Sequence, residues 1–368
     1  MNIILIGFSI RLFLTLINLY FFALPGGEYD TGKFHNEAVL YKSYLSGSVG
    51  SFDYQLGWLY SYILGIIYYY IVESVLLGSI LSCLAWLLSA IIFRSILIRL
   101  KVKNNSINFA LLIYTFVFPI SLIYTSFMLR EVYILLIFNF IVLLILKINP
   151  EKKIFFKVLN ILFLIIVTII FFYFHRSNAV LVITILPILL SIYLIRIFKI
   201  RLLNFNMIIF LPLIIYFLFY INFFERVFDI IWFYQLGHFD PFDPFRADYY
   251  NYKEHSQLEY SFLGLIIHIL KNIYNYFVQP SVFNVSSIAD FVAFYENFVR
   301  LAFIFVCIFK LNKNFEKRDL FLFIFLMVFL MEVIYAQATV NWGSATRHHV
   351  PTMGLIILML FFPTRNKL

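Results

Sequence analysis

The sequence predicts an all-α fold, a polytopic integral membrane bundle of about ten transmembrane helices with juxtamembrane helices on its outer face. Hydrophobic residues make up 63% of the 368 residues, whereas charged residues make up only 13%. A soluble domain carries about a quarter charged residues, so this composition cannot cover a surface that faces water. Backbone groups in lipid need partners within their own segment, which favours helices.

Ten apolar runs predict the spans, several of them reaching the ~20 residues with which a helix crosses the hydrocarbon core. They lie at residues 2–24, 75–93, 106–126, 132–147, 154–174, 178–195, 205–222, 291–309, 320–336 and 350–363. The first run is too long for a signal peptide and has no small-residue cleavage site, so we expect a retained helix. Two more stretches, 56–72 and 261–278, are rich in Tyr or carry polar residues, and they either lie along the interface or cross the bilayer.

The charge distribution predicts the orientation. If both ambiguous stretches stay on one side, 16 of the 28 Lys and Arg residues fall in loops on one face, and 14 of the 19 carboxylates fall on the other. The basic face is then the cytoplasm, which also accounts for the net charge of +9 without a nucleic acid partner. We expect one transmembrane domain, residues 1–368, in a bacterial inner membrane, with both termini cytoplasmic and outer-face loops 25–74, 223–290 and 337–349.

The first outer loop carries a candidate general base. Residues 25–47 read PGGEYDTGKFHNEAVLYKSYLSG, in which charged residues crowd at the membrane surface. The spacing of Asp30, Phe34 and Ala38 predicts one face of a short helix. Asp30, held against a low-dielectric wall, could then take the proton of a hydroxyl group, and we expect the nearby His35 to contact substrate. The alternative is an ordinary solvated loop.

Two charged residues, Arg130 and Glu131, interrupt an otherwise apolar stretch at its outer turn. Adjacent helical residues point about 100° apart, so the two side chains are not expected to pair by default. One of them should face the protein interior, and the other can reach the interface.

A predicted tight outer turn, FHRSN, consists almost entirely of His175 and Arg176. Positive charge is disfavoured on this face, so the cationic pair favours an anionic ligand more than it would in a cytoplasmic loop.

The last outer loop carries Arg347, His348 and His349 directly before the final span. Pro351 suits the first turn of that span, and the helix N-terminus adds free N–H groups and a partial positive charge. Together with Arg176, these residues could hold a phosphate or pyrophosphate. Anchoring to lipid headgroups is the alternative, and a metal site is not indicated because adjacent histidines point apart.

The long outer segment 223–290 mixes aromatic residues with Asp, His and Arg. This composition is typical of carbohydrate contact surfaces, and equally of an aromatic belt at the membrane interface.

These motifs resemble the GT-C type of membrane glycosyltransferase, above all the bacterial branch that uses polyprenyl-phosphate sugars. The resemblance spans most of the chain, but its motifs are short. They are D-x-x-x-F-H-x-x-A after the first helix, a Tyr-rich stretch ending in Glu73–Ser74, P-x-x-x-x-Y-x-S-x-x-x-R-E at the end of the third span, and an N-x-G-x-x-x-R-H stretch formed by Asn341, Gly343, Arg347 and His348. His349 stands where the family often has a further basic residue.

The resemblance implies a role for each site residue. Asp30 would be the general base, and Glu131 would stand in for an Asp that many members carry after the third span. The residues that would bind substrate are His35, Arg130, His175, Arg176, Arg347, His348 and His349. The donor stores the energy of the reaction, so no nucleotide cofactor is expected, and only the need for a divalent cation is left open. The expected partners are a polyprenyl-linked sugar donor, a glycan or lipid acceptor, and membrane lipids.

Two other functions fit the same features. An O-antigen-type polysaccharide polymerase would also be polytopic and would use outward cationic loops to handle a lipid-linked repeat. A flippase or transporter for lipid-linked oligosaccharides is the alternative of another class. It predicts charged or broken spans near the bilayer centre and a two-fold repeat.

Overall fold

The computed structural model describes residues 2–25, 28–55, 57–148, 154–175, 178, 262–311, 313, 315, 317–339 and 342–364. Within these ranges the regular structure is helical and contains no strand, which confirms the all-α class. Six of the described helices are long and apolar enough to cross a membrane by length and composition. Of the ten expected spans, 205–222 lies outside the described residues, as does 178–195 except for Asn178.

The described helices comprise six candidate spans and several shorter elements. The six candidate spans are α1 (Asn2–Tyr20), α4 (Val75–Arg99), α7 (Glu131–Ile148), α8 (Ile154–Phe174), α14 (Ile288–Lys310) and α15 (Arg318–Ala338). The shorter elements are α2 (Glu28–Leu45), α3 (Leu59–Tyr70), α5 (Asn104–Phe116), α6 (Pro119–Tyr124), α13 (Phe262–Val278), the 3-10 turn η1 (Val282–Asn284), α16 (Trp342–His348) and α17 (Val350–Leu360).

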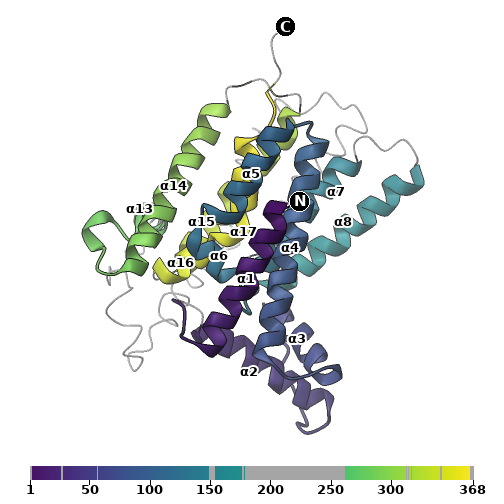
Figure 1. Ribbon diagram of the computed structural model, residues 1–368. Helices are drawn as coiled ribbons and strands as arrows, with labels where there is room; N and C mark the ends of the chain where they lie inside the picture. Colours follow the sequence, from purple (N-terminus) through teal and green to yellow (C-terminus); the bar gives the residue numbers. More distant parts are fainter. Residues whose placement is uncertain are drawn as a thin grey trace.

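The long helices form a bundle, and α2 lies across its lower end in Figure 1. The centre of the bundle is α17, whose residues from Val350 to Met359 are all buried and which contacts α5, α7, α14 and α15. Its 11 residues are too few for a span, so the expected crossing at 350–363 is a short core helix. Its apolar side chains are buried by protein on every side.

The expected continuous span at 106–126 is broken in two. The helix α5 ends at Phe116 and α6 restarts at Pro119. A proline disfavours the helical conformation in the residue before it and fits the first turn of a new helix. The freed N–H groups at the restart have a partner, because Glu296 of α14 accepts hydrogen bonds from the backbone of Ile120 and Ser121.

The first outer loop forms a hairpin of α2 and α3. The helix α2 is the one that the spacing of Asp30, Phe34 and Ala38 predicted, and α3 falls in the ambiguous stretch 56–72. The hairpin is close-packed: a Cβ atom added at Gly65 would lie 2.8 Å from the backbone oxygen of Ala38. An ion pair of 2.8 Å between Lys42 and Glu73 joins α2 to the end of the hairpin. Ser74 then caps α4 by accepting a hydrogen bond from the backbone N–H of Leu77. These contacts fix where the first turn of α2 meets the bundle.

Candidate functional site

Four charged side chains from three parts of the chain meet at the lower end of the bundle. Arg347 of α16 donates a hydrogen bond through Nη1 to Oδ2 of Asp30 in α2. The Nε atom of Arg347 lies 3.2 Å from Oε1 of Glu131, the first residue of α7. Arg130 Nε lies 3.7 Å from the same Glu131 oxygen. We call Asp30, Arg130, Glu131 and Arg347 the charge cluster.

Local structure brings Asp30 to this position. It sits in the first turn of α2, where the helix dipole favours a carboxylate. One and two turns later Phe34 and Ala38 are buried, which is the face that the spacing predicted. The Arg130 guanidinium lies 5.3 Å from the centre of the Phe34 ring, and its Nη1 donates to the carbonyl oxygen of Gly57 at 2.9 Å. Arg130 therefore fastens the hairpin to the start of α7.

The residues of the charge cluster are buried to different extents. The Glu131 side chain is 2% exposed, whereas those of Arg347 and Asp30 are 11% and 28% exposed. Burial lowers the pKa of Arg347 to about 10, so the guanidinium remains charged at neutral pH. Two cations and two carboxylates thus balance one another, with Glu131 at the base and Asp30 at the rim.

A small aromatic and polar group adjoins Arg347. The His348 ring stacks on Tyr335 of α15 at 4.8 Å, and His175 at the end of α8 meets the His348 ring edge-on at 5.7 Å. Because the Thr339 hydroxyl donates to the backbone oxygen of Tyr335, it accepts from Nδ1 of His348 at 2.8 Å. His348 therefore carries its proton on Nδ1 and presents Nε2 as an acceptor.

His348 is a neutral group at pH 7. Burial and the nearby Arg347 hold the pKa of His348 well below its usual value. The sequence predicted a cation at this position. The structure instead supplies an uncharged imidazole next to the arginine.

The remaining sequence-predicted residues lie elsewhere. His35 faces α3 and donates from Nδ1 to the Tyr68 hydroxyl at 3.1 Å, since that hydroxyl itself donates to the sulfur of Met128. His349 is fully buried and contacts Glu332 of α15. Arg176 is outside the described residues.

Several buried polar residues, at the site and away from it, were not among the sequence-predicted residues. Tyr335 supplies the surface on which His348 stacks, and nothing in an apolar run distinguishes such a tyrosine. Glu296 and Arg300 did offer a pattern, because oppositely charged residues four apart inside an apolar run are unusual. Within the described ranges, no group of three or more His, Cys, Asp or Glu residues is placed to hold a metal ion.

The chemical capacity of the charge cluster is that of an anion site with a carboxylate at its edge. Guanidinium groups bind phosphate oxygens by paired hydrogen bonds, and a carboxylate at the rim can accept a proton. The chain matches no family model, no curated protein and no solved structure. Its function is therefore argued from the geometry of this cluster.

Proposed function

We propose that the chain is a membrane glycosyltransferase that moves a sugar or oligosaccharide from a polyprenyl-phosphate or pyrophosphate carrier to a glycan or lipid-linked acceptor in surface polysaccharide biosynthesis. The observation that supports this most strongly is the position of Arg347 between Asp30 and Glu131. A guanidinium, which binds phosphate well, is there in direct contact with a carboxylate that we propose as the base.

To bind, the donor would replace one of the two carboxylates that contact Arg347. The donor phosphate takes the place of the rim carboxylate of Asp30 on Nη1, while the buried Glu131 keeps the guanidinium in position through Nε. Arg130, whose side chain is 16% exposed, adds a second positive charge. These cations then stabilise the negative charge that develops on the leaving phosphate as the glycosidic bond breaks.

The same replacement would free the Asp30 carboxylate to act as a base. Once the phosphate occupies Arg347, the Asp30 carboxylate is free to accept the proton of an acceptor hydroxyl. The hydroxyl oxygen forms the new bond to the anomeric carbon, and the phosphate leaves with the electrons of the old one. The ion pair thus keeps the base masked until donor is present.

The proposed location is the outer face of a bacterial inner membrane. The basic loops expected on the opposite side support this orientation through the positive-inside rule. The lipid chain of the donor would remain in the bilayer, and its phosphate would reach the charge cluster at the membrane surface.

The direct test is product analysis. Purified protein in lipid nanodiscs is incubated with polyprenyl-linked sugars and candidate acceptors, and products are read by mass. A new glycoside from wild-type protein but not from Arg347→Ala supports the proposal. The absence of product from any donor, with the protein folded, counts against it.

A polysaccharide polymerase would use the same site, and chain length separates the two. In a strain that lacks this protein, a polymerase defect leaves surface glycan with a single repeat. Loss of a single-sugar transferase instead truncates or removes the repeat itself.

Transport is the second candidate, favoured by the broken span at Pro119 and by the charged residues Glu296 and Glu332 within candidate spans. Transporters place discontinuous helices and buried charges at their substrate sites. A flippase would move a fluorescent lipid-linked oligosaccharide across a liposome membrane without any change in its mass. Movement without a glycosidic product would favour this function.

A further inference from the structure

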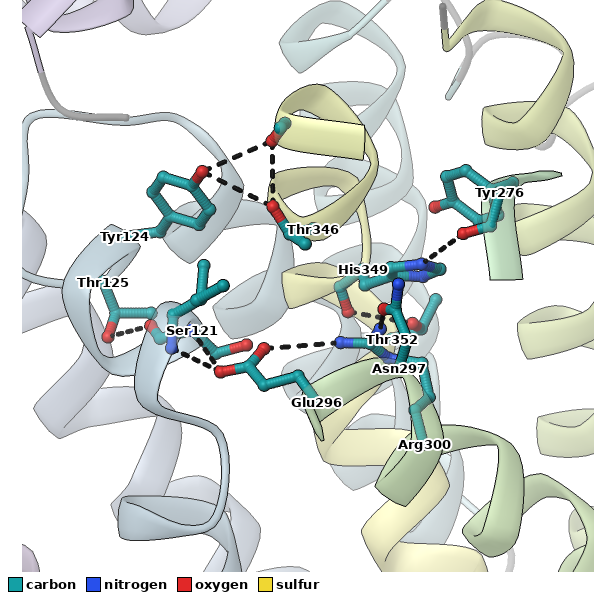
Figure 2. A network of polar contacts seen from close by, with 12 residues as sticks. Ser121, Tyr124, Thr125, Tyr276, Glu296, Asn297, Arg300, Thr346, His349 and Thr352 are labelled. Atoms are coloured by element: carbon teal, nitrogen blue, oxygen red, sulfur yellow. Dashed lines mark hydrogen bonds and ion pairs between the residues drawn. The ribbon is translucent and has the colours of Figure 1, made fainter. Parts of the chain in front are cut away.

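The α2–α3 hairpin, at the lower end of the bundle in Figure 1, carries a group of aromatic side chains apart from the charge cluster. The polar residues in Figure 2 are closed off from solvent, since Glu296 and Arg300 are at most 1% exposed. The aromatic group, in contrast, reaches the surface. Its five residues come from α2, the loop after it and the start of α3, and they are Tyr41, Tyr44, Phe52, Tyr54 and Tyr62. We call them the aromatic cluster.

The rings of the aromatic cluster pack closely around Tyr41. The centre of the Tyr41 ring lies 5.0 Å from that of Phe52 and 5.1 Å from that of Tyr62. The Tyr54 ring lies 5.2 Å from Phe52 and 5.6 Å from Tyr62. The backbone N–H of Gln55 also donates to the Tyr62 hydroxyl at 2.7 Å, which ties the loop to α3. The rings are therefore held in place before a ligand arrives, and this lowers the entropic cost of binding.

Tyr54 belongs to a part of the hairpin that faces water. The residue is 62% exposed. Every residue of the adjoining turn 46–51, which reads SGSVGS, is exposed as well. Irregular backbone of this kind needs water as a hydrogen-bond partner and does not lie exposed to hydrocarbon. The open side of the aromatic cluster therefore faces the aqueous phase.

The helix α3 turns a different kind of surface outward. Its residues Ile63, Ile66 and Tyr70 are 40%, 42% and 77% exposed, and their spacing places them along one side of the helix. The helix contains no charged residue. This apolar side suits contact with lipid. The tyrosine hydroxyls of the aromatic cluster, with the exposed carboxylate of Asp53 beside Tyr54, suit a ligand that is rich in hydroxyl groups.

The aromatic cluster is continuous with the charge cluster. The carbonyl oxygen of Gly57 accepts a hydrogen bond from Arg130 at 2.9 Å. Trp58 follows directly, and its carbonyl oxygen accepts from the backbone N–H of Tyr62 at 3.2 Å. The helix α2 makes a second connection, because Tyr41 lies three turns after Asp30 on the same side of the helix, about 16 Å further along the axis.

A ligand that reaches both clusters must offer a hydroxyl group at Asp30 and flat apolar faces with further hydroxyls three helical turns away. A chain of sugars has both features. The C–H face of a sugar ring packs on an aromatic ring, and sugar hydroxyls exchange hydrogen bonds with tyrosine hydroxyls and carboxylates. A single sugar is too short to make both contacts.

We propose that the aromatic cluster binds the acceptor, and that this acceptor is an oligosaccharide of several sugar units. Its reacting hydroxyl lies at Asp30, and its further units lie on Tyr54 and the neighbouring rings. This assignment rests on the glycosyl transfer proposed above, since that reaction gives Asp30 its role as the base.

Binding without donor tests the aromatic cluster separately from the reaction. The probe is a length-graded series of oligosaccharides, released by mild acid from the surface polysaccharide of the host strain and added to purified protein in nanodiscs. Wild-type protein should bind the longer members, and Tyr54→Ala should bind them about tenfold more weakly. The matched control is Tyr70→Ala, which removes an exposed tyrosine from α3 and should bind as the wild type does. Equal binding by Tyr54→Ala and wild type, or no binding by the wild type, overturns the proposal.

Transfer kinetics distinguish this proposal from the proposed function. Tyr54→Ala should raise the KM of a long acceptor about tenfold, with kcat unchanged and with no effect on a single-sugar acceptor. Transfer in which Tyr54→Ala leaves every KM unchanged overturns the assignment of the aromatic cluster and leaves the glycosyltransferase function standing. Oligosaccharide binding that depends on Tyr54, without transfer from any donor, overturns that function and supports a sugar-binding surface alone.

Contact of the aromatic cluster with lipid is the alternative, and a fluorescent label detects it. Tyr54→Cys, in a protein whose Cys83 and Cys307 are changed to alanine, is labelled with an environment-sensitive dye. The dye should emit as in water, be quenched by iodide, and shift its emission when the long oligosaccharides are added. Emission as in lipid, with quenching by brominated lipids, overturns the proposal.

Discussion

Arg347 is the residue on which the proposed chemistry depends, because two carboxylates of different exposure share it. Glu131 is buried beneath it, and Asp30 lies at the rim. A partly exposed ion pair contributes ~1 kcal/mol or less, so a phosphate that binds through two hydrogen bonds can displace Asp30. The buried Glu131 is not displaced as readily, since moving it would leave its charge without a partner.

Asp30→Asn separates donor binding from transfer. The amide cannot serve as a base, so transfer should fall by about 10²-fold or more. Donor affinity should rise by up to about fivefold, because the competitor for Arg347 is gone. Turnover and equilibrium binding of a polyprenyl phosphate in nanodiscs measure the two effects. Weaker donor binding in this variant would refute the exchange on Arg347.

His348 gives a pH dependence of its own. Burial holds the pKa of His348 well below its usual value, whereas the unfolded chain protonates this residue near about pH 6.5. Stability should therefore fall as the pH drops below that value, because the unfolded state takes up a proton that the folded state does not. Thermal unfolding at about pH 7 and about pH 5 should show a smaller loss in His348→Gln than in the wild type. Equal losses in the two proteins would contradict the assignment of a neutral His348.

At the scale of single elements, the restart of α6 depends on a side chain from another helix. Glu296 accepts from the backbone N–H groups of Ile120 and Ser121 and so satisfies donors that the break at Pro119 leaves without helical partners. The position of α6 in turn sets the path of the chain toward Arg130. Glu296 is therefore connected to the candidate site through α6, although neither Glu296 nor any site residue lies in that helix.

Replacement of Glu296 tests this connection. Glu296→Ala leaves buried N–H groups unpaired and should cost about 1–3 kcal/mol of stability. Glu296→Gln keeps an acceptor oxygen, so its Tm should lie between those of the alanine variant and the wild type. Thermal unfolding in nanodiscs gives the order, and an alanine variant as stable as the wild type would show that the break is satisfied by other groups.

The hairpin of α2 and α3 offers a second test at this scale. A side chain at Gly65 would collide with Ala38 and Tyr41 of α2, so Gly65→Val should lower the Tm through a steric cost of about 1–3 kcal/mol. Gly50 has open space around its Cα atom and provides the matched control. Gly50→Val should unfold close to the wild-type temperature. A Gly65→Val protein with unchanged Tm would mean that the close approach of the two helices is not needed.

Across the whole molecule, hydropathy predicted the positions of the long helices better than it predicted which way individual side chains face. The runs that begin at residues 2, 75, 132 and 154 correspond to α1, α4, α7 and α8, because a long apolar segment has few alternatives in lipid. The sequence predicted that the loops of Asp30 and Arg347 lie on the same face, and the structure brings the two side chains into contact. It was not expected that His348 would be neutral, since its protonation depends on neighbours far apart in the chain.

The corner at residues 347–349 shows why the rest could not be predicted. Three consecutive polar residues look alike in a sequence, yet Arg347 faces Asp30 and His349 faces Glu332. Which residue turns inward depends on the start of α17 and on the partner that α15 presents. A hydropathy pattern contains neither. The same limit applies to α17, which is as apolar as a span but is only a short core helix.

The most direct test of the account asks whether Asp30 and Arg347 lie together on the outer side of the membrane. Both are replaced by cysteine in a protein whose natural cysteines, Cys83 and Cys307, are changed to alanine. Intact cells are then treated with a short bifunctional thiol reagent that does not cross membranes. The account predicts a cross-link between the two positions in intact cells. A cross-link that forms only after the cells are permeabilised, or two cysteines that react singly and never join, would contradict it.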